Sequence, residues 1–137
     1  ALEMRKKAYA DNPNHPDLAL SYNNVGVAYG ELGDIQKDLE YQLKALEIRK
    51  KVYADNPNHP DLATSYNNVG FAYGELGDYQ KALEYALKAL EIFQKVYADN
   101  PNHPDLALSY HYVGFAYGKL GDKQKALEYF SKAREIY

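Results

Sequence analysis

Apolar residues recur along the middle of the chain at the spacing of a helix. Leu62, Tyr66, Val69, Tyr73 and Leu76 follow one another at intervals of four, three, four and three residues. These intervals place all five side chains on one face of an α-helix. The pattern therefore predicts an amphipathic helix whose apolar face packs against a neighbour.

The residues around this stripe predict where the helix begins and ends. Pro60 suits the first helical turn, because its missing N–H needs no partner there, and His59 then takes the N-cap position. Gly77 is expected to end the helix in the left-handed conformation. Asp78 is expected to cap a second helix. The apolar side of that second helix consists of Ala82, Leu83, Ala86, Ala89, Leu90, Phe93, Val96 and Tyr97.

The same pattern occurs three times. The string DNPNHPDLA begins at Asp11, Asp55 and Asp99, so the period is 44 residues. A fixed period of this size is typical of stacked supersecondary units. We predict one solenoid domain, made of the end of a preceding second helix at 1–10, repeat 1 at 11–54, repeat 2 at 55–98 and a truncated repeat 3 at 99–137.

Repeat 1 departs from repeat 2 at two positions that matter for packing. Asp38 and Gln42 stand where repeat 2 has the small apolar residues Ala82 and Ala86. A carboxylate in a closed interface is costly without a partner. Asp38 is expected in the first turn of its helix, where a negative charge is tolerated. We interpret both residues as tolerated substitutions, and a functional acid remains the alternative.

Composition and charge restrict the function classes. The chain carries 16 Lys and Arg against 19 Asp and Glu, a formal net charge of −3, and no Cys. This balance predicts no basic surface for nucleic acid and no polybasic membrane contact. No apolar run approaches the ~18 residues of a membrane span, and no signal peptide is evident. We expect a cytoplasmic protein. Because the chain opens at Ala1 without Met, we interpret it as a piece of a longer protein, of natural or designed origin.

No catalytic or cofactor motif stands out. His15, His59 and His103 occupy identical NHPD loops. Helices of neighbouring repeats stack ~8–10 Å apart, whereas zinc–ligand bonds measure ~2 Å, so these histidines are expected to cap helices or pack the loops. The glycines form neither a GxGxxG motif nor a phosphate loop. We predict no enzyme activity, no metal and no cofactor.

The repeats resemble the tetratricopeptide family. Repeat 2 reads Y-x2-V-G-x2-Y from Tyr66 and A-x3-A from Ala82; repeat 3 reads Y-x2-V-G-x2-Y from Tyr110 and A-x3-F from Ala126. The family pattern is W-x2-L-G-x2-Y followed by A-x3-F. The longer period, with Gln94 where the pattern has Pro, indicates an elongated second helix. The resemblance covers essentially the whole chain and is especially close to kinesin light chains and their bacterial relatives.

This resemblance implies an all-α fold, a right-handed superhelical α-solenoid of antiparallel helix pairs whose first helices line a concave groove. In kinesin light chains, paired asparagines at the matching positions lie in the groove that receives extended cargo peptides. Repeat 3 departs, because His111 and Tyr112 replace the pair. The predicted groove residues are Asn23, Asn24, Val27, Asn67, Asn68, Phe71, His111, Tyr112, Phe115 and Lys119.

The residues themselves favour the same surface. Val27, Phe71 and Phe115 would form an apolar strip in register, and flanking asparagine amides can hold a peptide backbone of any sequence. With Lys119 as its one cation, the groove does not fit the Lys/Arg clamp of chaperone-tail-binding members. The alternative for the asparagines is bonding between neighbouring helices.

Two functions from different classes follow. The first is a scaffold that binds an extended or short helical protein segment in the groove. The alternative is a structural or engineered array that has no ligand of its own and forms a homo-oligomer by end-to-end packing or exchange of a repeat.

Overall fold

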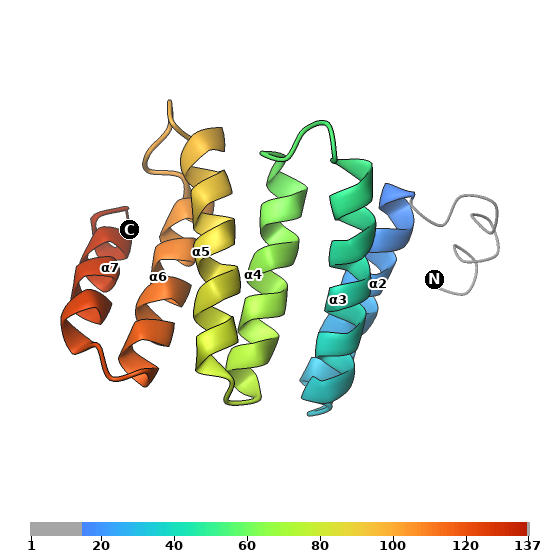
Figure 1. The fold of residues 1–137 in the computed structure, drawn as a ribbon, viewed down its shortest axis with the longest axis horizontal. Coiled ribbons are helices and arrows are strands. Elements are labelled where there is room, and N and C mark those ends of the chain that lie inside the picture. Colours follow the sequence, from blue (N-terminus) through green and yellow to red (C-terminus); the bar gives the residue numbers. More distant parts are fainter. Residues whose placement is uncertain (1–14, 137) are drawn as a thin grey trace.

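A computed structural model describes residues 15–136 of the chain. The segment 1–10, predicted to end a preceding helix, lies outside the described residues. The described residues form helices that follow one another side by side as a row (Figure 1). Their bounds are α2 Pro16–Glu31, α3 Ile35–Val52, α4 Pro60–Glu75, α5 Tyr79–Val96, α6 Pro104–Lys119 and α7 Lys123–Ile136.

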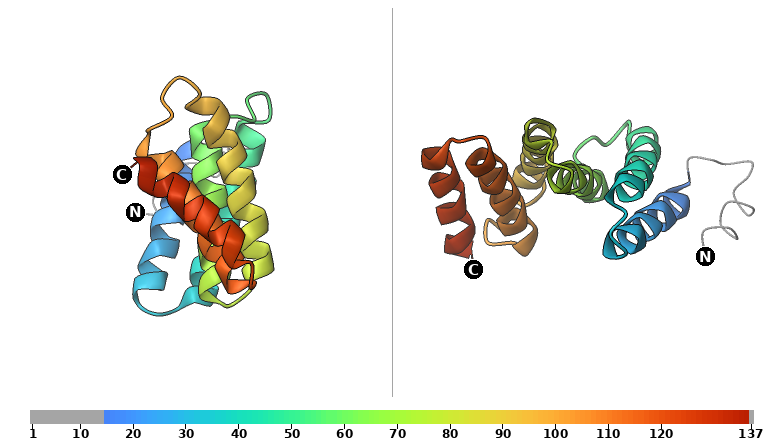
Figure 2. Two further views of the ribbon diagram at one scale, coloured as in Figure 1. Left: turned by 90° about the vertical axis from the view of Figure 1, so that its left-hand side faces the viewer. Right: turned by 90° about the horizontal axis from the view of Figure 1, so that it is seen from below.

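The helices pack as successive pairs. α2 lies against α3, α4 against α5 and α6 against α7, while α3 also contacts α4 and α5 also contacts α6. Seen from below, the pairs follow one another along the row (Figure 2, right), and each pair contacts the next. The predicted all-α solenoid of antiparallel helix pairs is therefore confirmed. Within residues 15–136, no helix is both long and apolar enough to cross a membrane.

Each first helix begins in the way the NHPD loop predicts. His15, His59 and His103 are the N-caps, and the Nδ1 atom of each accepts the backbone N–H two residues later, at 3.1, 3.0 and 3.1 Å. Tyr53 stacks on His59 and Tyr97 stacks on His103, with ring centroids 3.8 and 3.7 Å apart. The expected capping and loop-packing role is confirmed for these histidines.

The turn between paired helices also follows the prediction, with one correction. Gly77 has φ +87°, in the left-handed region, and the Asp78 carboxylate accepts the N–H of Lys81 at 3.2 Å to cap α5. Leu76 was expected on the buried stripe, but it is 42% exposed. It occupies the C-cap of α4, still in the right-handed helical conformation with its N–H bonded to the Ala72 oxygen, and the chain leaves the helix at Gly77.

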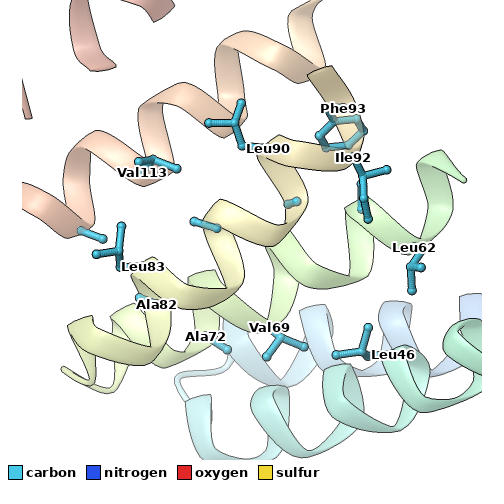
Figure 3. Packing of buried hydrophobic residues seen from close by; sticks show 14 of the residues in the cluster. Leu46, Leu62, Val69, Ala72, Ala82, Leu83, Leu90, Ile92, Phe93 and Val113 are labelled. Atoms are coloured by element: carbon cyan, nitrogen blue, oxygen red, sulfur yellow. The ribbon is translucent and has the colours of Figure 1, made fainter. Parts of the chain in front are cut away.

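The hydrophobic core runs through the centre of the row (Figure 3). Val69 and Val113 are fully buried and Phe93 is nearly so. Figure 3 shows Val69 of α4 pointing towards Leu46 of α3, so consecutive pairs share one core. This core holds α4 and α6 in place, and a second cluster of Leu18, Ala19, Ala45 and Ile48 holds α2 against α3; the face that these first helices form carries the candidate site.

Candidate functional site

Three apolar side chains stand exposed at the same position of the first helices. Val27 on α2, Phe71 on α4 and Phe115 on α6 are 48, 48 and 41% exposed. Val27 and Phe71 line one hollow, and Phe71 and Phe115 line a second. The three apolar side chains are therefore exposed in register, as predicted, and Phe71 is the middle one.

The hollow between α4, α5 and α6, here called the aromatic pocket, has a volume of about 170 Å³ and a mostly apolar lining. Apart from Glu75, the lining consists of glycine and alanine residues and of aromatic side chains. The lining residues are Gly70, Phe71, Gly74, Glu75, Ala82, Ala86, His111, Tyr112 and Phe115.

One position of the repeat determines how much space this pocket has. The residue at that position is Gln42 in repeat 1, Ala86 in repeat 2 and Phe130 in repeat 3. A Cβ added to Gly26 would stand 2.7 Å from the Gln42 amide nitrogen, and one added to Gly114 would stand 3.0 Å from the Phe130 ring. Large side chains thus pack beside these glycines in repeats 1 and 3. In repeat 2 Ala86 places no large side chain beside Gly70, whose nearest neighbours are main-chain and Cβ atoms of α5.

Two further hollows continue the site into a groove. A hollow of about 420 Å³, here called the acidic hollow, shares Phe71, Glu75 and Tyr112 with the aromatic pocket. A smaller one of about 100 Å³ shares Asn68 and Tyr112 with the acidic hollow. The other residues of the acidic hollow are Val27, Gly30, Glu31, Ile35, Asp38, Gln42 and Asn68, and those of the smaller one are Thr64, Asn67, Phe93, Asp105 and Leu108.

The charges that line these hollows are all acidic among the described residues. Glu31, Asp38 and Glu75 line the acidic hollow, and Asp105 lines the smaller one. Lys119 does not line any of them; its ammonium lies over the Phe115 ring, 5.5 Å from the ring centroid. The groove therefore carries a negative potential, with one cation at the outer wall of the aromatic pocket.

Asp38 is buried at the edge of the acidic hollow. It is 8% exposed, and its Oδ1 accepts a hydrogen bond of 3.1 Å from the amide of Gln42, which is 1% exposed. Burial raises the pKa of Asp38; the Gln42 hydrogen bond acts against this rise, and repulsion from Glu75 adds to it. The carboxylate therefore has the partner that a buried charge requires, and it also faces a second acid across the hollow.

Asn23 requires a correction, because it was expected to face the groove but is 6% exposed and lines none of the hollows; Asn67 is 5% exposed but lines the smaller hollow. The Asn67 amide donates to Ser109 Oγ at 3.1 Å, which joins α4 to α6. Asn23, oriented by its neighbours, donates to Gln42 Oε1 at 2.6 Å and accepts from Arg49 at 2.7 Å. Bonding between helices, the alternative interpretation, applies to these two residues.

Arg49 was not among the predicted residues, although it holds the first two repeats together. It is 6% exposed and donates to the main-chain oxygen of Asp61 at 3.1 Å and to Ser65 Oγ at 3.0 Å. Burial lowers the pKa of Arg49, and the nearby Asp61 charge opposes that shift. With Asn23 and Gln42 it forms a polar network where repeat 2 has the apolar Phe93.

The remaining predicted residues lie on the first-helix face. Asn24 is exposed and Asn68 is half-buried. Tyr112 tilts against Phe71, with ring centroids 5.7 Å apart, and exposed His111 lies 5.2 Å from the Phe130 ring. Asn68 thus lines two of the hollows and Asn67 lines one, whereas Asn23 and Asn24 line none. Among the described residues, no group of three or more His, Cys, Asp or Glu side chains is placed to hold a metal ion.

Comparison with solved structures finds the same architecture in longer chains. BtubC (BKLC) from P. vanneervenii is 27% identical with a TM-score of 0.86, over 98% of this chain and 53% of that one. The kinesin light chain TPR-like repeats from Podosopora anserina are 26% identical with a TM-score of 0.78, over 98% and 63%. The apo form of RapI is 26% identical with a TM-score of 0.83, over 98% and 46%. The chain thus spans roughly half to two thirds of these three structures.

Sequence comparison gives the family. No curated protein sequence matches the chain. The tetratricopeptide repeat profiles match residues 39–95 and 61–137, and another tetratricopeptide repeat profile matches residues 19–52. Because these matches cover well over half of the sequence, the chain belongs to the tetratricopeptide repeat family.

Proposed function

We propose that this chain is an adaptor module that binds a peptide segment of another protein, extended or as a short helix, along the first-helix groove. Repeats of this family are generally scaffolds for protein interaction. The observation that carries the proposal is the continuous groove beneath Val27, Phe71 and Phe115, whose side chains are exposed in register. A line of exposed apolar side chains offers anchor points for a binding partner.

The polar residues of the groove suit a peptide backbone. Asn68 lines both the acidic hollow and the smaller hollow, midway along the groove. Its amide has donors and an acceptor, so it can pair with a main-chain N–H or C=O of any guest residue. The helices that frame the groove are fixed by the shared core, so the surface is largely preformed. An interface of this modest size predicts affinities on the order of micromolar.

The test is selection of random displayed peptides on the chain, followed by fluorescence anisotropy with the selected sequences. Phe71→Ala is expected to weaken binding about tenfold, since truncating a central aromatic anchor costs ~1–2 kcal/mol. Leu32→Ala is the matched control, because Leu32 is 82% exposed and lies in none of the hollows. Equal binding by parent and Phe71→Ala, for every selected peptide, would reject the groove.

A second candidate is self-association at the α7 end of the row. Leu127 of α7 is 67% exposed, whereas Leu83 at the same position of α5 is 8% exposed and packs in the core. A second copy covering α7 would bury that leucine through a head-to-tail contact. Light scattering over a concentration series tests this: mass that rises for the parent and not for Leu127→Glu supports association, and a constant monomer mass excludes it.

A further inference from the structure

We infer that the aromatic pocket receives one bulky apolar side chain of the guest, and that a neighbouring Lys or Arg of the guest lies at the acidic hollow, between Glu75 and Asp38. This inference rests on the proposed function and specifies the chemistry of the peptide. Three observations carry it. They are the size of the aromatic pocket, the Phe130 ring that packs beside Gly114 in repeat 3, and the acidic side chains that line the acidic hollow.

The size of the pocket fits one side chain. Its volume is about 170 Å³ and its lining is mostly apolar. An apolar cavity of about 150 Å³ in a protein binds benzene. The ring of Phe, or the branched chain of Leu, is therefore of the right volume. The walls formed by Phe71, Tyr112 and Phe115 favour a ring, because aromatic pairs gain attraction beyond their buried area.

The chain itself supplies a side chain of this kind in another repeat. In repeat 3 the Phe130 ring fills the space beside Gly114, and His111 lies against it at 5.2 Å. In repeat 2 the residue at that position is Ala86. A Cβ on Gly70, the equivalent of Gly114, would have main-chain and Cβ atoms of α5 at 3.2–3.4 Å as its nearest neighbours, and no ring among them. A guest ring entering the pocket would occupy the equivalent position.

The acidic side chains around the pocket determine which charge is favoured on the guest residue next to the ring. Glu75 lines both the aromatic pocket and the acidic hollow, and Asp38 and Glu31 line the latter. None of the three forms an ion pair with the described residues, whose ion pairs lie elsewhere. The Oδ1 atom of Asp38 is held by Gln42, while Oδ2 lies over Gly30 with no hydrogen bond from the described part of the chain.

A cation placed there relieves an existing repulsion. Glu75 and Asp38 are close enough for the Glu75 charge to raise the pKa of Asp38. A guest Lys or Arg between them would attract both carboxylates, whereas a guest Asp or Glu would be repelled by both. Lys119 sits on the opposite wall, over Phe115. The guest cation is therefore directed towards the α3 side of the pocket and away from α6.

The test uses fluorescein-labelled synthetic peptides of about ten residues, otherwise Gly, Ser and Asn, with one Phe and two adjacent Lys in either order. Matched peptides replace Phe by Ala or both Lys by Glu. We expect the better Lys–Phe peptide to bind most tightly, with each replacement weakening it about tenfold or more. Raising NaCl from about 50 to about 500 mM should weaken the Lys–Phe peptide and not its Glu counterpart.

Protein variants locate the two contacts separately. Ala86→Phe copies the filled arrangement of Phe130 and should abolish the advantage of Phe over Ala in the peptide. Ala86→Gln copies Gln42 and serves the same purpose if the larger ring prevents folding, which circular dichroism reports. Glu75→Gln should remove the preference for Lys over Glu, while Glu84→Gln, on the exposed side of α5, should leave it unchanged.

The outcomes separate this inference from the proposed function. Failure of every Lys–Phe peptide to bind, tighter binding of the Glu peptide, or an intact Phe advantage in both Ala86 variants overturns the inference. If randomly selected peptides still depend on Phe71 but lack a cation or a bulky residue, the groove stands and the inference falls. If no selected peptide depends on Phe71, both fall.

Discussion

Replacing the buried Arg49 by alanine is expected to destabilise the chain strongly. The Arg49 guanidinium donates to Ser65 Oγ at 3.0 Å, to the Asp61 main-chain oxygen at 3.1 Å and to Asn23 at 2.7 Å. Asn23 and Ser65 are buried, so both lose a donor that water cannot replace. Unsatisfied buried groups cost ~1–3 kcal/mol each, and breaking a buried charged network costs ~3–5 kcal/mol. We expect Arg49→Ala to lower the free energy of unfolding by about 3–5 kcal/mol.

Repeat 2 provides a matched control for this cost. The triple variant Asp38→Ala, Gln42→Ala, Arg49→Phe gives α3 the residues of α5 at these three positions, where Phe93 of α5 is 2% exposed. Asn23 can then bond to Ser65, as Asn67 bonds to Ser109 at 3.1 Å. Replacing a whole buried polar network by packed apolar groups is often neutral or stabilising by ~1–4 kcal/mol. The triple variant is therefore expected to equal or exceed the parent in stability.

Urea unfolding followed by circular dichroism at 222 nm and by tyrosine fluorescence measures both variants. Coincident curves and unchanged m-values are needed for the comparison of free energies. The reasoning is refuted if Arg49→Ala costs less than about 1 kcal/mol, which would mean that the network contributes little. It is also refuted if the triple variant is as unstable as Arg49→Ala, because the loss would then come from packing and not from unpaired polar groups.

Three further changes test other parts of the structure. Burial and the Glu75 charge raise the pKa of Asp38 above its ordinary 3.8, so ionisation of Asp38 disfavours the folded state. Asp38→Asn should therefore raise the free energy of unfolding, and this gain should grow as the pH rises above 3.8. A difference between the urea curves that does not depend on pH would contradict this. Gly70→Ala should destabilise the fold by ~1–3 kcal/mol, because the new Cβ would stand 3.2 Å from a backbone oxygen of α5. Gly74→Ala, whose Cβ would have its nearest neighbour at 3.7 Å, should stabilise the fold by up to ~1 kcal/mol. Similar melting temperatures for the two variants would refute the close approach at Gly70. His59→Ala should lower stability by ~1–2 kcal/mol through the lost cap, and His59→Asn should retain most of it; equal thermal denaturation of both variants would show that capping is not the role.

The sequence predicted the fold well because local signals agreed with one another. The stripe from Leu62 to Tyr73 fixed the buried face of a helix, and the His59 and Gly77 signals fixed its ends. The prediction for Leu76 was wrong although its backbone is still helical. A periodic stripe gives the helix face on which a side chain lies, but not whether a neighbouring helix extends far enough to cover it.

The candidate site was predicted less completely, since adjacent residues on a helix point about 100° apart. Asn67 and Asn68 both lie off the apolar stripe and both line the smaller hollow, but Asn67 is buried against Ser109 of α6 whereas Asn68 is only half-buried. Which one is covered depends on the angle between neighbouring pairs, and a single repeat carries no information on that angle.

A usable signal for Arg49 was present in the sequence. Asp38, Gln42 and Arg49 are three of the seven differences between the first two repeats, and their spacing of four and seven residues places them on one helix face. Reading the three substitutions together would have predicted a shared polar contact. The aromatic pocket had no such signal, because an alanine at position 86 indicates missing volume only once the surrounding helices are in place.

The most direct test of the groove is a crystal structure of the chain with a peptide obtained by selection. The account predicts electron density for the guest along α4 and α6, with a bulky side chain beside Gly74 and between Phe71 and Phe115. A guest bound to the outer surface of α3 and α5, with the groove occupied by solvent alone, would contradict it.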